Sequence, residues 1–336
     1  MQLQHVPTID LAPYFEGTPE GKAQVAKEVD RACKDIGFLV ITNHGIPAEL
    51  VDRVYSLSRE FFNLPMAEKR KVDRPRPDMV RGYSAVAEES LSYSMDEAAP
   101  GDLKESFSIG PSGVPDDNYH LGADAGSHFA HNVWPENIPG FREAYVEYFG
   151  AMSHLARSLM RIFALALKLD EHFFDDKIDK EISMLRTLSY PNMGTNIEEG
   201  QMRAGAHTDY GSLTIVKPDK SPGGLQVCNQ NGDWVSVPYV EDSFAVNIGD
   251  LMMRWTNDQW ISTLHRVVNP PMDAEATEPR QSIVFFHQPN YDAMIECLPS
   301  CLDEDGKGKY PAVSSGDHLK SKFVKQTTFG GTQEVA

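Results

Sequence analysis

The sequence predicts an α+β protein whose core is mainly β and of the jelly-roll type, with flanking helices and an α/β module at its N-terminus. Short apolar stretches separated by turn residues follow one another between residues 182 and 288. Many short strands at this spacing are typical of a β-sandwich or barrel, and a jelly roll is its natural double-sheet form. The earlier part of the chain shows helical periodicity instead, which predicts the module and a long support helix.

The first 110 residues (1–110) are expected to form the α/β module. Apolar side chains recur at helical spacing from residue 20 until Gly37 ends the pattern. A second helical pattern has Pro47 in its first turn, where proline is favoured. In chain order we predict an edge strand at 6–10, a helix at 20–36, a buried strand at 38–42 and a helix at 47–62.

Residues 111–170 are expected to connect this module to the β core. The stretch 73–139 is rich in Pro, Gly, Ser and Asp, and loops this long in a compact domain are usually functional or disordered. A long amphipathic pattern at about 140–168 predicts a helix that supports the sheet.

The β core is placed at residues 171–300, and a C-terminal tail at 301–336 is polar and Gly-rich up to about Asp317. Strands are predicted at 182–190, 202–209, 212–216, 224–228, 233–237, 243–248, 251–255, 264–268 and 281–288.

The composition of the 336 residues is that of a soluble globular protein, with 41% hydrophobic and 24% charged residues. The net charge of −18 argues against nucleic acid or an anionic membrane as the main partner, since both need a basic surface.

Residues 1–15 contain no apolar run of signal-peptide length, so a cytoplasmic protein is expected. Four cysteines are expected to be free thiols in a reducing cytosol, with a redox or zinc role as the alternative: Cys33, Cys228, Cys297 and Cys301.

Three residues predict a metal site. His207 and Asp209 form a His-x-Asp pair, and His265 follows 58 positions after His207. On a strand, residues i and i+2 point to the same side, so the pair faces one way. Two imidazoles and one carboxylate are the ligand set of non-haem Fe(II), with positions left open for substrate and oxygen. A further histidine, His287, lies on the predicted strand that follows Arg280. Because side chains alternate along a strand, His287 points to the opposite side from Arg280 and is not expected to bind the metal.

Arg280 and Ser282 lie two residues apart on a predicted strand and therefore share a face, which continues to Phe286. A guanidinium group beside a hydroxyl suits a carboxylate, because two N–H donors meet two oxygens. The Tyr190 hydroxyl could complete this pocket, and a core position for Tyr190 is the alternative.

A second arginine, Arg186, shares a strand face with Tyr190. A buried arginine needs an anionic or carbonyl partner, which is either the substrate or a structural ion pair. Phe286, Tyr83 and Phe107 are candidate walls of the substrate pocket, the last two because 73–139 is expected to form a lid.

Together these motifs resemble the isopenicillin N synthase-like branch of the 2-oxoglutarate- and Fe(II)-dependent oxygenases, over nearly the whole chain. Within it, the chain looks most like microbial enzymes of the thymine 7-hydroxylase type. The residues that carry the resemblance are 6–10, 37–38, 43–45, 61–62, 81–85, 104–106, 189–191, 203–212, 223–227, 247–250, 254–258, 265–267 and 280–282.

The resemblance implies a double-stranded β-helix (cupin-like) with His207, Asp209 and His265 as iron ligands and Arg280, Ser282 and Tyr190 on the distal carboxylate of 2-oxoglutarate. It further implies O2 as co-substrate, ascorbate as reductant in vitro, and hydroxylation of an unactivated C–H bond of a small molecule, in secondary metabolism, with release of succinate. The stretch 270–279 makes the gap between His265 and Arg280 longer than usual in the family.

Two other functions remain open from the sequence. One is a 2-oxoglutarate-independent Fe(II) oxidase of the isopenicillin N synthase type, which would catalyse cyclisation or desaturation. The other is a non-catalytic binding module. Because related sequences act on many small molecules, the resemblance leaves substrate and oligomeric state open.

Overall fold

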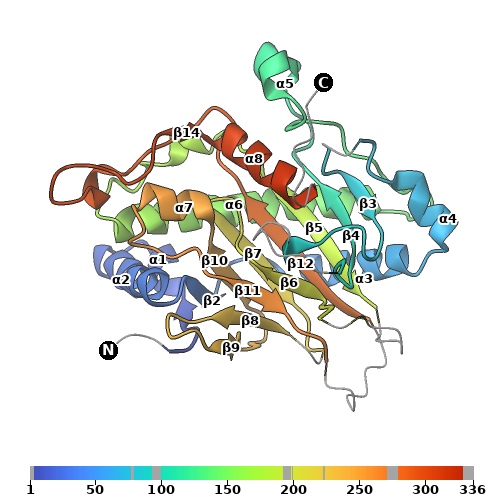
Figure 1. The fold of residues 1–336 in the computed structure, drawn as a ribbon, viewed down its shortest axis with the longest axis horizontal. Coiled ribbons are helices and arrows are strands. Elements are labelled where there is room, and N and C mark those ends of the chain that lie inside the picture. The colour runs from blue at the N-terminus through green and yellow to red at the C-terminus, as the bar shows by residue number, and fades with distance from the viewer. Residues whose placement is uncertain are drawn as a thin grey trace.

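Figure 1 shows the computed structural model of the chain, which describes residues 4–76, 79–92, 100–191, 198, 200–221, 224–270 and 279–327. The helices are α1 (Ala12–Phe15), α2 (Pro19–Asp35), α3 (Ala48–Phe62), α4 (Met66–Lys69), α5 (Asn118–Leu121), α6 (Phe141–Ala166), α7 (Asp250–Trp255) and α8 (Ser315–Thr327). The strands are β1 (Thr8–Asp10), β2 (Phe38–Thr42), β3 (Gly82–Ser84), β4 (Glu105–Ile109), β5 (Met184–Tyr190), β6 (Ala204–His207), β7 (Leu213–Pro218), β8 (Leu225–Cys228), β9 (Trp234–Ser236), β10 (Phe244–Ile248), β11 (His265–Val267), β12 (Arg280–His287), β13 (Met294–Ile295) and β14 (Val313–Ser314).

Two sheets form the core. The main sheet has eight strands in the order β1-β2-β10-β7-β12-β5-β4-β3, and the second has four in the order β6-β11-β8-β9. All neighbouring strands are antiparallel except β1 and β2. The mainly β, double-sheet core with flanking helices confirms the predicted fold class.

The N-terminal module is built into the main sheet. The edge strand β1 pairs with β2, and β2 pairs with β10 of the β core. Helix α2 begins where the Thr18 hydroxyl accepts a hydrogen bond from the Gly21 amide, an N-cap that satisfies a free backbone donor. It ends at Asp35, two residues before Gly37, whose φ of +65° and close approach to the Ile261 carbonyl exclude a side chain.

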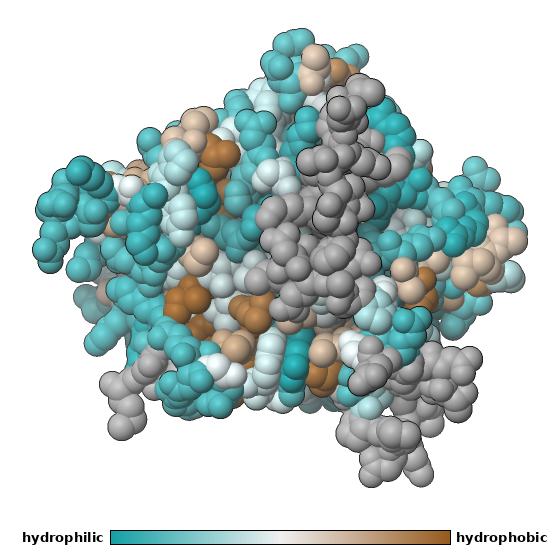
Figure 2. Space-filling model, viewed as in Figure 1, coloured by the Kyte–Doolittle hydropathy of each residue, from teal (hydrophilic) through white to brown (hydrophobic). Residues whose placement is uncertain are grey.

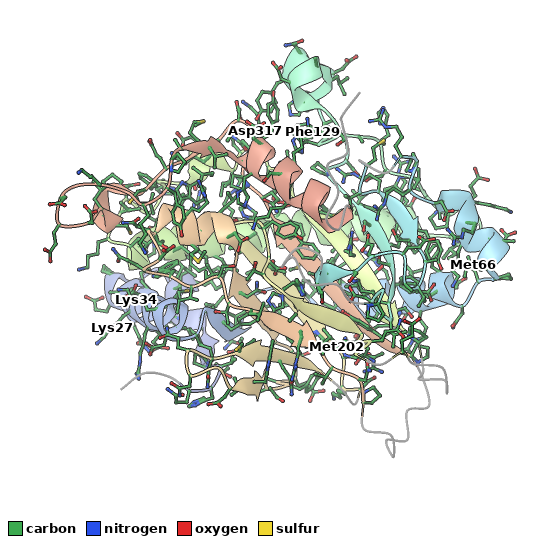
Figure 3. All side chains as sticks on the ribbon, in the orientation of Figure 1. Lys27, Lys34, Met66, Phe129, Met202 and Asp317 are labelled. Carbon is green, nitrogen blue, oxygen red and sulfur yellow. The ribbon has the colours of Figure 1, made fainter. Side chains whose placement is uncertain are left out.

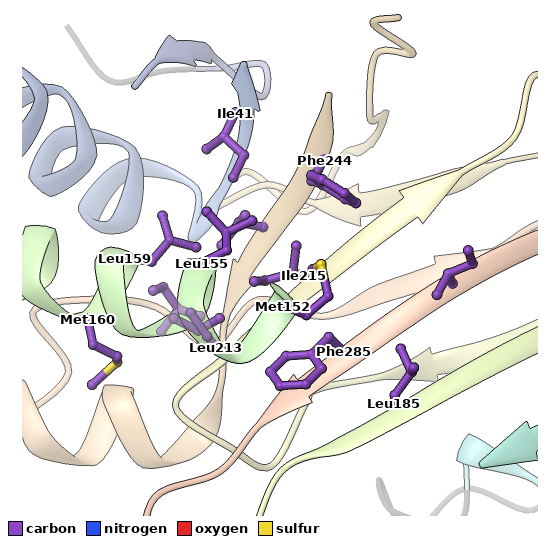
Figure 4. Packing of buried hydrophobic residues seen from close by; sticks show 14 of the residues in the cluster. Ile41, Met152, Leu155, Leu159, Met160, Leu185, Leu213, Ile215, Phe244 and Phe285 are labelled. Atoms are coloured by element: carbon purple, nitrogen blue, oxygen red, sulfur yellow. The ribbon is translucent and has the colours of Figure 1, made fainter. Parts of the chain in front are cut away.

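Helix α6 covers the outer face of the main sheet, and this contact belongs to the main cluster of the hydrophobic core (Figure 4). Leu155 and Leu159 of α6 face the sheet, where Ile215 of β7 and Phe285 of β12 are also buried. Phe285 further packs edge-on against Phe149 of α6, with ring centroids 5.3 Å apart. The predicted support helix at 140–168 is thus confirmed.

The inner faces of the two sheets pack on each other through a second apolar cluster. Leu188, Tyr190 and Val284 come from the main sheet, whereas Ala204 and Val267 come from β6 and β11. Because side chains alternate along a strand, β12 presents apolar residues to α6 on one side and its even-numbered residues to the space between the sheets on the other.

Helix α8 crosses the front of the molecule beside α7 (Figure 1). Its start lies next to the segment that carries Phe129, as the labels of Asp317 and Phe129 show in Figure 3, and Leu319 packs there with Phe129. Lys322 of α8 donates a hydrogen bond of 2.6 Å to Asp250 at the start of α7. Helix α8 is therefore linked by this hydrogen bond to α7, the helix that follows β10.

Three expectations from the sequence need correction or fall outside the description. The strand predicted at 251–255 is helix α7, because a short apolar run cannot distinguish strand from helix and its Leu, Met and Arg residues favour a helix. The stretch 73–139 is not one separate lid, since β3 and β4 extend the main sheet. Of the stretch 270–279, which lengthens the gap between His265 and Arg280, residues 271–278 lie outside the described part of the chain.

Among the described residues, no helix is both long and apolar enough to cross a membrane. The face in Figure 2 is mostly hydrophilic, and its apolar side chains form small separate patches. All four cysteines are free thiols.

Replacing Phe285 by Ala is expected to lower the free energy of unfolding by about 3–5 kcal/mol, because it removes a fully buried ring between β12 and α6. Urea denaturation followed by circular dichroism measures this change. The matched control is Phe15→Ala, whose side chain is 47% exposed and whose loss should stay within about 0.5 kcal/mol. Equal losses in the two variants would contradict this account of the core.

Candidate metal and co-substrate site

The pairing of β6 with β11 brings the three predicted metal ligands together. His265 and His207 are direct partners across the two strands, and Asp209 follows two residues after His207. One ligand atom from each residue lies within 4.8 Å of the others, and all three side chains are buried. The carboxylate oxygen Oδ1 of Asp209 is 3.8 Å from Nε2 of His207 and 3.7 Å from Nε2 of His265.

Backbone carbonyls orient both imidazole rings. Nδ1 of His207 lies 2.8 Å from the Gly205 carbonyl, and Nδ1 of His265 lies 3.0 Å from the Thr263 carbonyl. A carbonyl can only accept, so each Nδ1 carries a proton, and Nε2 is the nitrogen of each ring that is left to bind a metal. Phe38 packs edge-on against His265 and holds that ring from the side.

The charges of this group suit a divalent cation. Burial lowers the pKa of His207 to about 4, and the neighbouring His265 acts in the same direction. Burial acts to raise the pKa of Asp209, but both histidines and hydrogen bonds from Thr214 and Asn247 outweigh it and lower the pKa. The neutral His207 imidazole, the Asp209 carboxylate and the adjacent His265 imidazole together form the donor set preferred by Fe(II).

A second group of polar residues lies on the inner face of the main sheet. Arg280 of β12 is the direct partner of Tyr190 of β5, and its guanidinium lies 4.7 Å from the centre of the tyrosine ring. The hydroxyl groups of Tyr190 and Ser282 are 3.3 Å apart. Arg280 is only 2% exposed, and its Nε and Nη1 have no hydrogen-bond partner among the described residues. Buried charged donors without partners are costly, so this group of residues fits an anion.

Comparison with known proteins identifies the family. Residues 6–137 match the family described as non-haem dioxygenase in morphine synthesis, N-terminal, and residues 182–289 match the 2OG-Fe(II) oxygenase superfamily. The chain is 34% identical to the 2-oxoglutarate-Fe(II) type oxidoreductase hxnY of Emericella nidulans, over 94% of this chain and 89% of that protein. It is 31% identical to validamycin A dioxygenase of Streptomyces hygroscopicus subsp. limoneus, over 96% and 87%.

Solved structures agree with these relatives. The thymine 7-hydroxylase of Neurospora crassa, crystallised in complex with alpha-KG, superposes with a TM-score of 0.83 and 34% identity over 95% of both chains. The chain belongs to the 2-oxoglutarate- and Fe(II)-dependent oxygenases. The predicted likeness to enzymes of the thymine 7-hydroxylase type is thus confirmed, and the 2-oxoglutarate-independent oxidase is not favoured. The oxygenase uses Fe(II), for which His207, Asp209 and His265 form the ligand triad, and 2-oxoglutarate.

Arg186 of this oxygenase has an ion-pair partner inside the fold. Its Nε donates to the Ser108 hydroxyl at 2.9 Å, and its Nη1 lies 3.1 Å from a carboxylate oxygen of Glu89. Burial acts to raise the pKa of Glu89, but the charges of Arg186, Lys104 and Arg74 outweigh it and lower the pKa to about 2. The structural ion pair left open by the sequence is therefore present, and Glu89 is a residue that the sequence analysis missed because it lies in an irregular segment.

Phe286 packs, partly buried, against the apolar cluster between the sheets, on the same side of β12 as Ser282. Tyr83 and Phe107 do not reach this space. Both are fully buried in the core cluster on the outer side of the sheet, where Phe107 packs edge-on against Phe141 of α6. Alternation along β4 turns Phe107 away from the triad, which corrects the expectation that these two residues line the substrate pocket.

No role was predicted from the sequence for Asn247, although this polar residue lies within one of the family motifs. Its side-chain Nδ2 donates to Oδ2 of Asp209 at 2.7 Å. The signal that could have revealed it is one amide side chain within the apolar strand β10.

His287 lies on the outer side of β12, as the alternation predicted, and so points away from the triad. Its Nδ1 is 2.6 Å from the Ser212 hydroxyl. Burial, followed by the charge of Arg157, lowers the pKa of His287 to about 3, so the ring is neutral in the folded protein.

Replacing His287 by Asn is expected to flatten the pH dependence of stability. Between about pH 6 and pH 4 the unfolded chain protonates this histidine and the folded protein largely does not, so stability falls as the pH falls, by roughly 1 kcal/mol per pH unit from this group. Urea titrations across this range should show a wild-type slope that exceeds the slope of the variant by about that amount. His131→Asn, at an exposed side chain, is the control; a His287→Asn slope equal to the wild-type slope would disprove the expectation.

Proposed function

We propose that this oxygenase hydroxylates an unactivated C–H bond of a small polar molecule, and that Arg280, Ser282 and Tyr190 bind the distal carboxylate of 2-oxoglutarate. The observation that carries the proposal is the buried Arg280 guanidinium, which has two nitrogens without a partner among the described residues and two hydroxyl groups beside it. A guanidinium can meet both oxygens of a carboxylate at once, which fixes the orientation of the bound acid.

When bound, the iron together with 2-oxoglutarate and O2 supplies the oxidising power, and 2-oxoglutarate is converted to succinate and carbon dioxide. The residues of the chain supply binding and position. The triad presents two nitrogens and one oxygen on one side, so the other side stays accessible. Apolar side chains of the inner cluster, among them Val267 and Val284, keep water from the space between the sheets.

The substrate side of the pocket is proposed to include Arg186 and Phe286. The Arg186–Glu89 pair offers hydrogen-bond donors and acceptors on the inner face, and Phe286 offers an aromatic surface. Three relatives are named for, or crystallised with, small polar molecules: validamycin A, homoarginine and, in a crystal structure of the N. crassa thymine 7-hydroxylase, thymine. A substrate of this size with polar N–H, O–H or C=O groups fits such a pocket.

We further propose a cytoplasmic enzyme of secondary metabolism whose partner is a small molecule rather than nucleic acid or a membrane. The net charge of −18 disfavours polyanionic partners, and four free cysteines suit a reducing compartment.

We also propose that the chain is divided into an N-terminal module (1–110), a connecting segment (111–170), a β core (171–300) and a tail (301–336). The two family matches, at 6–137 and 182–289, support separate N-terminal and core parts.

Arg280→Leu should weaken 2-oxoglutarate binding by about 100-fold, because it leaves the carboxylate without its charged partner. Tyr190→Phe removes one neutral hydrogen bond and should cost about 5-fold. Anaerobic calorimetry of the Mn(II)-loaded protein measures both affinities. The control is Arg161→Leu, which removes an arginine paired with Asp175 far from β12 along the chain; an Arg280→Leu affinity as high as that of the control would contradict the proposed clamp.

The purified protein, supplied with Fe(II), ascorbate and 2-oxoglutarate under air, is expected to release succinate, and a true substrate from a panel of small polar molecules should accelerate this release. His207→Ala should abolish it, because one of three metal ligands is lost. Mass spectrometry of the substrate should show a gain of one oxygen atom. A panel compound that accelerates succinate release but leaves a desaturated or cyclised product would overturn hydroxylation while leaving the enzyme class intact.

A further inference from the structure

The two oxygens of the Asp209 carboxylate have different surroundings. Oδ1 faces the two histidines, at 3.8 Å from Nε2 of His207 and 3.7 Å from Nε2 of His265. Oδ2 instead accepts the hydrogen bond of 2.7 Å from Nδ2 of Asn247. One oxygen is therefore directed to the metal position, while the other is engaged by an amide.

Asn247 is held in place by the main sheet. Its backbone lies between Phe38 of β2 and Thr214 of β7, and its side chain is 1% exposed. The flanking residues Val246 and Ile248 belong to the core cluster on the α6 side, so alternation turns Asn247 to the space between the sheets. A buried amide is costly unless it is hydrogen-bonded. The contact with Asp209 satisfies this requirement and connects the main sheet to the segment after β6 that carries Asp209.

We propose that Asn247 is a positioning residue that keeps Asp209 a one-oxygen ligand of the iron. Three protein donors leave three positions of an octahedron for the co-substrate and oxygen. A carboxylate that bound through both oxygens would occupy a fourth position and compete with the keto acid. By donating to Oδ2, Asn247 withholds that oxygen and fixes the carboxylate rotamer. The proposal rests on the iron triad and is independent of the substrate and of the clamp at Arg280.

The test is metal binding by an Asn247→Leu variant, which has a similar volume but no donor. Titration with Mn(II) in calorimetry should show affinity reduced by about 10–100-fold relative to the wild type. The Co(II)-loaded variant should also give an altered ligand-field absorption spectrum, because the released oxygen changes the coordination. In the Mn(II)-saturated variant, 2-oxoglutarate should bind more weakly than in the Mn(II)-saturated wild type.

The matched control is Asn290→Leu. Asn290 is also buried, and its Nδ2 also donates to a carboxylate at 2.7 Å, that of Asp179, but it does not contact the triad. The Asn290→Leu variant loses a buried amide but keeps the orientation of the metal ligands. Its Mn(II) affinity and Co(II) spectrum should therefore match those of the wild type. If Asn247→Leu does not fold by circular dichroism, Asn247→Ala replaces it in the same comparison.

Three results would overturn the inference in distinguishable ways. A wild-type protein that fails to bind Mn(II) would refute the metal site itself. A folded Asn247 variant with wild-type metal affinity and an unchanged Co(II) spectrum would refute only the role of Asn247. An Asn290→Leu variant that loses metal affinity to the same extent would show that general destabilisation, and not ligand orientation, causes the effect.

Discussion

The site of this oxygenase depends on the register between β6 and β11. Because His265 stands directly opposite His207, both imidazoles reach the same side of the small sheet, and Asp209 closes the triangle from the turn after β6. A shift of one residue would turn the ligands of one strand to the other face. The register shifts just beyond this pair, where Val267 lies opposite Ala204. Because of this irregularity, both the core residue Ala204 and the metal ligand His207 of β6 can face inward.

Strand β12 couples this site to the stability of the whole molecule. Its outer residues Ile283 and Phe285 lie in the core cluster with α6, while Arg280 and Ser282 face the space between the sheets. Burial of the outer side fixes the strand, and the fixed strand holds an arginine whose Nε and Nη1 have no hydrogen-bond partner among the described residues. The folding free energy of the core thus maintains a costly, unsatisfied cation where an anionic co-substrate is needed.

The sequence predicted the regular parts of this structure well. Helices at 20–36 and 140–168 and the strands around His207, His265 and Arg280 lie within a few residues of the observed elements, because each has a clear period or a clear boundary. It failed at 251–255, where five apolar and basic residues carry no period, and at β3 and β4, whose pairing joins the 73–139 stretch to the distant strand β5. Such pairing depends on contacts far apart in the chain and leaves no local signal.

By itself the sequence determined the chemistry of the site: two imidazoles, one carboxylate, a guanidinium and hydroxyl groups, at spacings that place each pair on one side of a strand. Only the tertiary structure decided how these groups are completed. In the folded protein, Tyr83 and Phe107 lie in the core on the outer side of the main sheet. Arg186 forms an ion pair with Glu89, and Asn247 donates a hydrogen bond to Asp209. Residue spacing fixes the direction of a side chain along its own strand, but which residue it meets depends on how separate strands and sheets pack in space.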